Sequence, residues 1–261
     1  GHAMTGRLSS AMLTAFAAAI CVFLVLPTLA VAPISFTETN FITFPPRGFT
    51  LHWYREFFER PEWIGSLGTS AVVAVLTAAL STTLGTMIAL GLGQLPRRTG
   101  RAVTFFFIMP MVVPTIITAA ALYTPFARAG LVASIPGLVL AHTVLALPFV
   151  VINVSAVLQK LDRRVVDAAR SLGATPATAF RRVTLPILAP GITAGVVFAF
   201  ITSFDEVVVA LFIAGADATT LPVQMWSGIR FEISPIVAAA SCLLLIVSCV
   251  VLTLFWLVQR K

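Results

Sequence analysis

The sequence predicts an all-α polytopic membrane protein with six transmembrane helices, and three observations carry this prediction. Hydrophobic residues make up 59% of the 261 residues and charged residues only 10%, against about 25% charged in soluble domains. The mean hydropathy is +1.01. Six apolar stretches are each long enough to cross a hydrocarbon layer of about 30 Å, which takes ~20 helical residues. A soluble fold is excluded, because a chain of this composition has too few polar residues to cover its surface in water. A disordered chain is also excluded, because so many apolar residues would make it collapse.

The six predicted spans cover residues 11–33, 68–93, 103–124, 131–158, 190–214 and 235–258. Residues 1–3 are interpreted as a tag remnant. Residues 4–33 are interpreted as an uncleaved first helix: the small-residue pattern at 30–32 resembles a signal-peptidase site, but Pro33 would occupy the position directly after the cut. A loop at 34–67, a five-helix core at 68–258 and a tail at 259–261 complete the predicted organisation. Pro110 and Pro114 are expected to bend the third span.

The basic residues predict the orientation of the chain in the membrane. The loops on the side of both termini hold twelve Lys and Arg residues, and the opposite loops hold five. Because basic loops stay in the cytoplasm, both termini are expected to be cytoplasmic. The net charge of +7 is therefore attributed to topology, and no nucleic-acid partner is expected.

The loop at 34–67 contains four large aromatic residues at helical spacing: Trp53, Tyr54, Phe57 and Phe58. This pattern favours a short amphipathic helix lying in the membrane interface on the periplasmic side. A solvated lid over the mouth of the helix bundle is the alternative.

The segment 159–189, between the fourth and fifth spans, is far longer than the 2–8 residues that a helix–helix connection requires. Apolar and small residues recur in it at helical spacing up to Leu172, and Gly173 then ends the helix. Thr175 followed by Pro176 is a typical helix start. The segment therefore predicts a short helix, a glycine corner and a second short helix that ends near Leu185-Pro186.

The same segment resembles the EAA motif, E-A-A-x3-G-x9-I-x-L-P, of membrane subunits of type I binding-protein-dependent ABC importers. Asp167-Ala168-Ala169, Gly173 and the run 183–186 match it, with Asp in place of Glu and Val in place of Ile. The runs 51–58, 141–150, 203–209, 221–226 and 233–235 are similar to the spermidine/putrescine permease branch of that family.

This resemblance implies a five-helix permease core in a bacterial inner membrane, paired with a second, different permease chain. It further implies two ATPase subunits that bind ATP and Mg, and a periplasmic substrate-binding protein; the chain itself needs no cofactor. The residues implied to couple to the ATPase are Arg163, Arg164, Asp167, Ala168, Ala169, Arg170, Gly173, Phe180, Leu185 and Pro186. The substitution Gly173→Asp is expected to abolish transport, through a clash or because the corner cannot form.

Asp205 and Glu206 lie about fifteen residues into the predicted fifth span, and carboxylates at such depth are functional candidates. Two interpretations stay open: they attract a cationic cargo, or they cap or pair structurally. Further pathway candidates are the aromatic and polar residues nearby: Phe200, Ser203, Phe204 and Trp226. His142, alone in the fourth span, is expected to bond to backbone.

No catalytic or metal site is predicted, because the chain lacks phosphate-loop, His-Glu-x-x-His and Gly-x-Ser-x-Gly motifs. Cys21, Cys242 and Cys249 are interpreted as packing residues. The expected function is that of a permease subunit, with a polyamine or related amine as cargo. An aminophosphonate, an opine or ferric iron is the alternative cargo, and a secondary transporter or a membrane scaffold is the alternative outside ABC importers.

Overall fold

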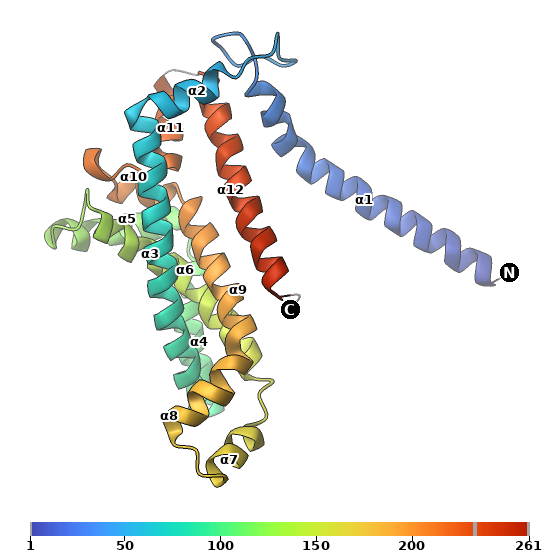
Figure 1. Ribbon diagram of the computed structural model, residues 1–261, viewed down its shortest axis with the longest axis vertical. Helices are drawn as coiled ribbons and strands as arrows, with labels where there is room; N and C mark the ends of the chain where they lie inside the picture. The colour runs from blue at the N-terminus through green and yellow to red at the C-terminus, as the bar shows by residue number, and fades with distance from the viewer. Residues whose placement is uncertain (1, 232–233, 260–261) are drawn as a thin grey trace. The chain divides into compact units, whose positions relative to one another are not determined.

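The computed structural model describes residues 2–231 and 234–259, and every regular element within them is a helix (Figure 1). The chain divides into two compact units, Gly1–Arg60 with Ser227–Leu245, and Pro61–Trp226 with Ile246–Lys261. The helices are α1 (His2–Ile34), α2 (His52–Glu59), α3 (Pro61–Leu92), α4 (Arg97–Val112), α5 (Thr115–Arg128), α6 (Ile135–Leu158), α7 (Arg163–Ser171), α8 (Pro176–Ala179), η1 (Phe180–Thr184), α9 (Leu185–Phe204), α10 (Val208–Ile213), η2 (Ala216–Ala218), α11 (Leu221–Phe231) and α12 (Ile236–Gln259).

Five helical segments among the described residues are long and apolar enough to span a membrane: Met12–Ile34, Pro61–Leu92, Ile135–Leu158, Pro176–Phe204 and Ile236–Leu257. The pair α4 and α5, bent by 101° at its break, makes a sixth if it is counted as one span. The prediction of an all-helical polytopic chain is therefore confirmed, with five or six spans.

The break in the third span lies at Pro114, as the sequence predicts. Val113 has an extended backbone (φ −74°, ψ 130°) and separates α4 from α5. A residue that precedes proline is disfavoured in the helical region, because the proline ring clashes with its backbone and Cβ. Pro110, by contrast, remains inside α4.

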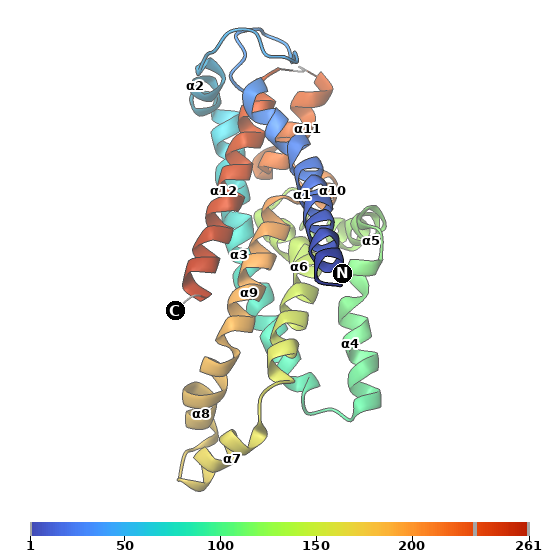
Figure 2. The same cartoon turned by 90° about the vertical axis from the view of Figure 1, so that its right-hand side faces the viewer.

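Helices α3, α6 and α9 pack together in the second unit, and Figure 2 shows them side by side. Small residues permit this approach. A Cβ on Gly85 of α3 would lie 2.7 Å from Val150 of α6, and one on Gly191 of α9 would lie 2.8 Å from the Asn153 carbonyl oxygen. Since packing rather than the hydrophobic effect drives helix association in lipid, these glycines define the core of this unit.

The fifth span differs from the prediction of 190–214 at both ends. Helical structure begins at Pro176, and α9 ends at Phe204. The chain then breaks before α10 begins at Val208. The physical reason is that the Glu206 carboxylate accepts the first N–H groups of α10, which starts a new helix.

The first unit contains the predicted short helix as α2. Trp53 and Phe57 are buried, and the Trp53 Nε1 donates a hydrogen bond to the Thr37 carbonyl oxygen at 2.7 Å. Tyr54 is half-buried and Phe58 is 55% exposed. Protein thus covers two of the four aromatic residues, and the location of α2 in the membrane interface stays a prediction.

Candidate functional site

The segment between α6 and α9 folds as a helical hairpin, which we call the coupling hairpin (residues 162–184). Asp162 caps α7 by accepting the Arg164 N–H at 2.9 Å. Gly173 turns the chain with φ +90°, and the Thr175 Oγ1 then accepts the Thr178 N–H at 3.2 Å to cap α8. The helix, glycine corner and second helix follow the predicted order. Figure 2 shows α7 and α8 beyond the end of α6.

The second helix of the hairpin does not end near Leu185-Pro186, contrary to the prediction. A π-helical turn, η1, follows α8 directly, and the Leu185 N–H donates to the Phe180 carbonyl five residues earlier. In a regular α-helix the ring of Pro186 would clash with the carbonyl four residues before it, and the wider turn accommodates this ring. Helical backbone consequently continues from Pro176 to Phe204.

Most of the predicted coupling residues are exposed, on this hairpin or in the first turn of α9 that follows it: Arg164, Asp167, Ala168, Arg170, Gly173, Phe180, Leu185 and Pro186. Ala169 is half-buried. Arg163 begins α7, but its side chain lies outside the described residues. Leu172, beside the glycine corner, is 90% exposed and was absent from the predicted set. An apolar residue directly before a helix-ending glycine was the signal available for it.

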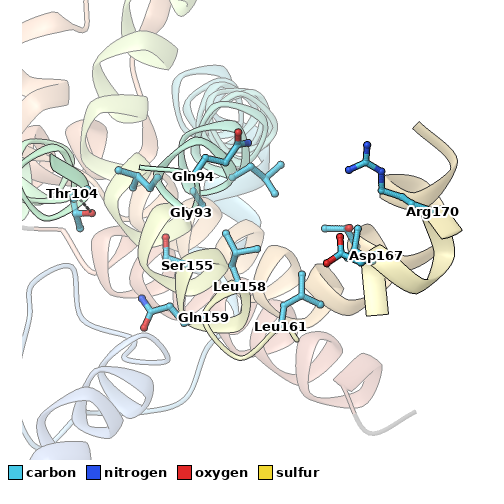
Figure 3. A pocket seen from close by; sticks show the side chains of 15 residues that line it. Gly93, Gln94, Thr104, Ser155, Leu158, Gln159, Leu161, Asp167 and Arg170 are labelled. Carbon is cyan, nitrogen blue, oxygen red and sulfur yellow. Dashed lines mark hydrogen bonds between the residues drawn. The ribbon is translucent and has the colours of Figure 1, made fainter. Parts of the chain in front are cut away.

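A cavity of about 720 Å³ separates the hairpin from the helix ends above it (Figure 3). Asp167 and Arg170 of α7 face it, together with Gln94 after α3, Thr104 of α4 and Ser155 of α6. Asp167 therefore borders a cavity of mixed polar and apolar lining as well as the outer surface of the unit.

A second cavity, of about 520 Å³, lies where two helix breaks meet, and we call it the break cavity. The α4–α5 break, α6 and the α9–α10 break each contribute to its wall. The carboxyl groups of Asp205 and Glu206 are its charged groups, and no Lys, Arg or His lines it among the described residues. Its lining is Pro110, Met111, Val113, Thr115, Leu145, Phe149, Ile201, Thr202, Asp205, Glu206, Val207 and Val208.

The other predicted pathway residues do not line the break cavity. Phe204 is 2% exposed and stacks on Phe200 with ring centroids 5.5 Å apart. Ser203 is 4% exposed, whereas Trp226 is 44% exposed. A role for these four residues in a pathway stays a prediction. Thr202 and Phe149 line the cavity and were missed, because their proximity depends on the two breaks.

Asp205 and Glu206 have different surroundings although they are neighbours in sequence. The Glu206 carboxylate accepts three backbone hydrogen bonds, each of 3.0 Å, from Val208, Val209 and Ala210. Asp205 ends α9 and is exposed. The geometry thus commits Glu206 to capping α10 and leaves the Asp205 carboxylate open to the cavity.

His142 forms a hydrogen bond with the side chain of Ser203, a partner that the sequence did not predict. Its Nδ1 lies 2.8 Å from the Ser203 Oγ, and its Nε2 lies 3.8 Å from the Glu206 Oε2. Ser, His and Glu are the residue types of a hydrolytic triad. However, their exposed fractions are 4%, 0% and 9%, and Glu206 is occupied as a helix cap. Ser203 and His142 are therefore enclosed by protein, and the three residues do not form an accessible hydrolytic site.

The described residues contain no group of three or more His, Cys, Asp or Glu side chains that could hold a metal ion. Cys21, Cys242 and Cys249 are free thiols.

Comparison with known proteins gives consistent matches. Residues 81–261 match the family described as binding-protein-dependent transport system inner membrane component. The chain is 31% identical to the spermidine/putrescine transport system permease protein PotC of Escherichia coli, over 98% of this chain and 96% of that protein. It is 32% identical to the putrescine transport system permease protein PotI of Escherichia coli, over 85% and 82%.

The fold is similar to a chain in the crystal structure of the bacterial alginate ABC transporter in complex with alginate pentasaccharide-bound periplasmic protein. The TM-score is 0.74 at 16% sequence identity, covering 95% of this chain and 92% of that chain. The resemblance drawn from the EAA motif is confirmed, and the secondary-transporter and scaffold alternatives are set aside. This chain belongs to the binding-protein-dependent transport system inner membrane component family, the non-catalytic, multi-pass permease subunits of ABC importers.

Proposed function

We propose that this permease forms half of a pathway that carries a polyamine, such as spermidine or putrescine, into the cell. The observation that carries the proposal is the break cavity, where the exposed carboxylate of Asp205 faces a lining without cationic side chains among the described residues. The two polyamine permeases that align with most of this chain support the same cargo.

The chemistry of the break cavity suits a flexible cation better than the alternative cargoes. A polyamine alternates ammonium groups with methylene segments, and Asp205 lies among apolar side chains such as Leu145 and Phe149. In a site of low dielectric constant, one carboxylate attracts an ammonium group strongly and repels the phosphonate or carboxylate groups of an aminophosphonate or opine. Ferric iron requires several hard oxygen ligands. The Glu206 carboxyl group already accepts three backbone N–H groups, so too few oxygen ligands remain in the cavity.

The coupling hairpin is the proposed contact with an ATPase subunit, and the importer would hold two such subunits, which would bind ATP and Mg. Leu172 and Phe180 offer apolar contacts, and Arg164 and Arg170 offer polar ones. In this arrangement the chain spans a bacterial inner membrane, and both termini lie on its cytoplasmic side. A second permease chain completes the pathway, and a periplasmic binding protein delivers the cargo. Closure of the ATPase subunits would push the hairpin and tilt the spans.

The test is ATP-dependent uptake into proteoliposomes that contain the complete importer with its binding protein. Radiolabelled putrescine and spermidine are expected to accumulate, whereas an aminophosphonate, an opine and ferric iron are not expected to compete. Asp205→Asn should lower uptake about tenfold, which corresponds to about 1.4 kcal/mol. Asp217→Asn is the matched control, because Asp217 is an exposed acid in η2 outside the break cavity. Equal uptake by both variants would contradict the role of Asp205.

A further inference from the structure

We propose that His142 is a positioning residue of the transport pathway, which holds the α9–α10 break so that Asp205 stays directed into the break cavity. The inference rests on the proposed function, because it assigns the cavity to the cargo. It concerns a residue that touches no cargo and acts through Glu206 and Ser203.

His142 joins three elements that are separate in sequence. The ring is fully buried on α6, and its two nitrogens face opposite sides of the break. Nδ1 lies 2.8 Å from the Oγ of Ser203, in the last turn of α9. Nε2 lies 3.8 Å from the Oε2 of Glu206, which caps α10. One side chain therefore contacts the chain both before and after Asp205.

The protonation of the ring follows from its neighbours. Glu206 accepts three backbone N–H groups, so both of its carboxyl oxygens act as acceptors. A proton on Nε2 then faces an acceptor oxygen of Glu206, and the Ser203 hydroxyl donates to the bare Nδ1. The opposite tautomer would place a lone pair of Nε2 against the carboxylate. The arrangement thus favours Ser203 as donor to His142, and the Nε2–H of His142 directed at Glu206.

The contact to Glu206 is the adjustable one of the two. Nε2 has no hydrogen-bond partner among the described residues. At 3.8 Å it attracts the carboxylate without a full hydrogen bond, and a movement of roughly 0.6–1 Å would form one. A small displacement of α10 relative to α6 therefore strengthens or breaks the hold on the segment that contains Asp205.

The test compares two amides at position 142 in the complete importer. In His142→Gln the longer side chain brings its amide N–H₂ near the position of Nε2 and keeps the contact to Glu206. In His142→Asn the shorter side chain reaches only Ser203. Thr143→Val is the matched control, because among the described residues the Thr143 hydroxyl bonds only to the Val139 carbonyl of its own helix, at 2.6 Å.

Two measurements are made on each variant. The first is the alkylation rate of Thr202→Cys, in the wall of the break cavity, in a chain whose three native cysteines are replaced by alanine. This rate is measured in the absence of cargo, so it does not depend on the proposed function. The second is polyamine uptake as a function of concentration, with the assembled complex quantified by size-exclusion chromatography.

His142→Asn is expected to change the alkylation rate at least fivefold and to lower uptake at least tenfold. His142→Gln and Thr143→Val should stay within twofold of the native chain.

Equal behaviour of the Asn and Gln variants would overturn the role of His142. An altered alkylation rate in His142→Asn, in an importer whose native form takes up no polyamine, would instead contradict the proposed cargo and leave the role of His142 standing. Wild-type uptake with unchanged alkylation in His142→Asn would contradict the inference and leave the cargo standing.

Discussion

The glycine corner of the coupling hairpin is the most direct place to test how the permease couples to its ATPase. Gly173 has φ +90°, and a Cβ built on it meets nothing within 4 Å. The clash anticipated for Gly173→Asp is therefore absent within this chain, and backbone strain remains. An L-residue in the left-handed region costs about 1–2 kcal/mol, which lowers the population of the native corner roughly 5- to 30-fold.

The assay is ATP hydrolysis stimulated by the cargo-loaded binding protein, measured beside uptake in the same proteoliposomes. Gly173→Ala is expected to lower both by about 5- to 30-fold, if only the native corner transmits the signal. Gly173→Asn should lose less, because asparagine tolerates positive φ. Basal ATP hydrolysis should change little in either variant, since the ATPase itself is intact.

Gly130→Ala provides the matched control. Gly130 also has positive φ (+68°) with nothing within 4 Å of a built Cβ, but it lies after α5, outside the coupling hairpin. This variant should carry a similar strain and keep stimulated hydrolysis close to that of the native chain. The reasoning is refuted if Gly173→Ala assembles and hydrolyses ATP like the native importer, or if both alanine variants lose stimulation equally.

Three further predictions concern packing and docking. Gly191→Ala places a Cβ 2.8 Å from a backbone oxygen of α6 and should destabilise the importer by about 1–3 kcal/mol, seen as a lower Tm, whereas Gly68→Ala has open space and should not. Leu172→Asp should weaken pull-down of the ATPase at least tenfold without loss of Tm, because the native side chain is 90% exposed; unchanged pull-down would exclude Leu172 from the contact. Trp53→Phe removes the bond to the Thr37 carbonyl and should cost about 1 kcal/mol in chemical denaturation; an unchanged midpoint would show that the bond contributes nothing.

The sequence predicts the hairpin well because each of its turns depends on local chemistry. Gly173 supplies the positive φ, and Thr175 with Pro176 supplies a cap and a fixed first turn. The same holds for the bend at Pro114, where the proline acts on the residue directly before it. Such features need no information about the rest of the fold.

The break after Phe204 was missed because hydropathy does not detect a helix cap. Residues 207–213 are apolar and prolong the run, so the sequence pattern favours one continuous span. Glu206 was the available signal, since an acidic side chain just before an apolar run can accept the first N–H groups of a new helix. The partnership of His142 with Ser203 and Glu206 depends on the packing of α6 against α9, which no local pattern encodes.

The π turn at Phe180–Thr184 has a mechanical consequence. It joins α8 to α9 without interruption, so that the glycine corner and Asp205 flank the two ends of one helical rod, Pro176–Phe204, of 29 residues. At about 1.5 Å per residue the rod is about 43 Å long, and a tilt of about 5° around its midpoint displaces each end by about 2 Å. Such a rod acts as a lever. When one end of the rod is displaced sideways, the other end moves in the opposite direction. The distance that the second end moves depends on where along the rod the neighbouring helices form the pivot.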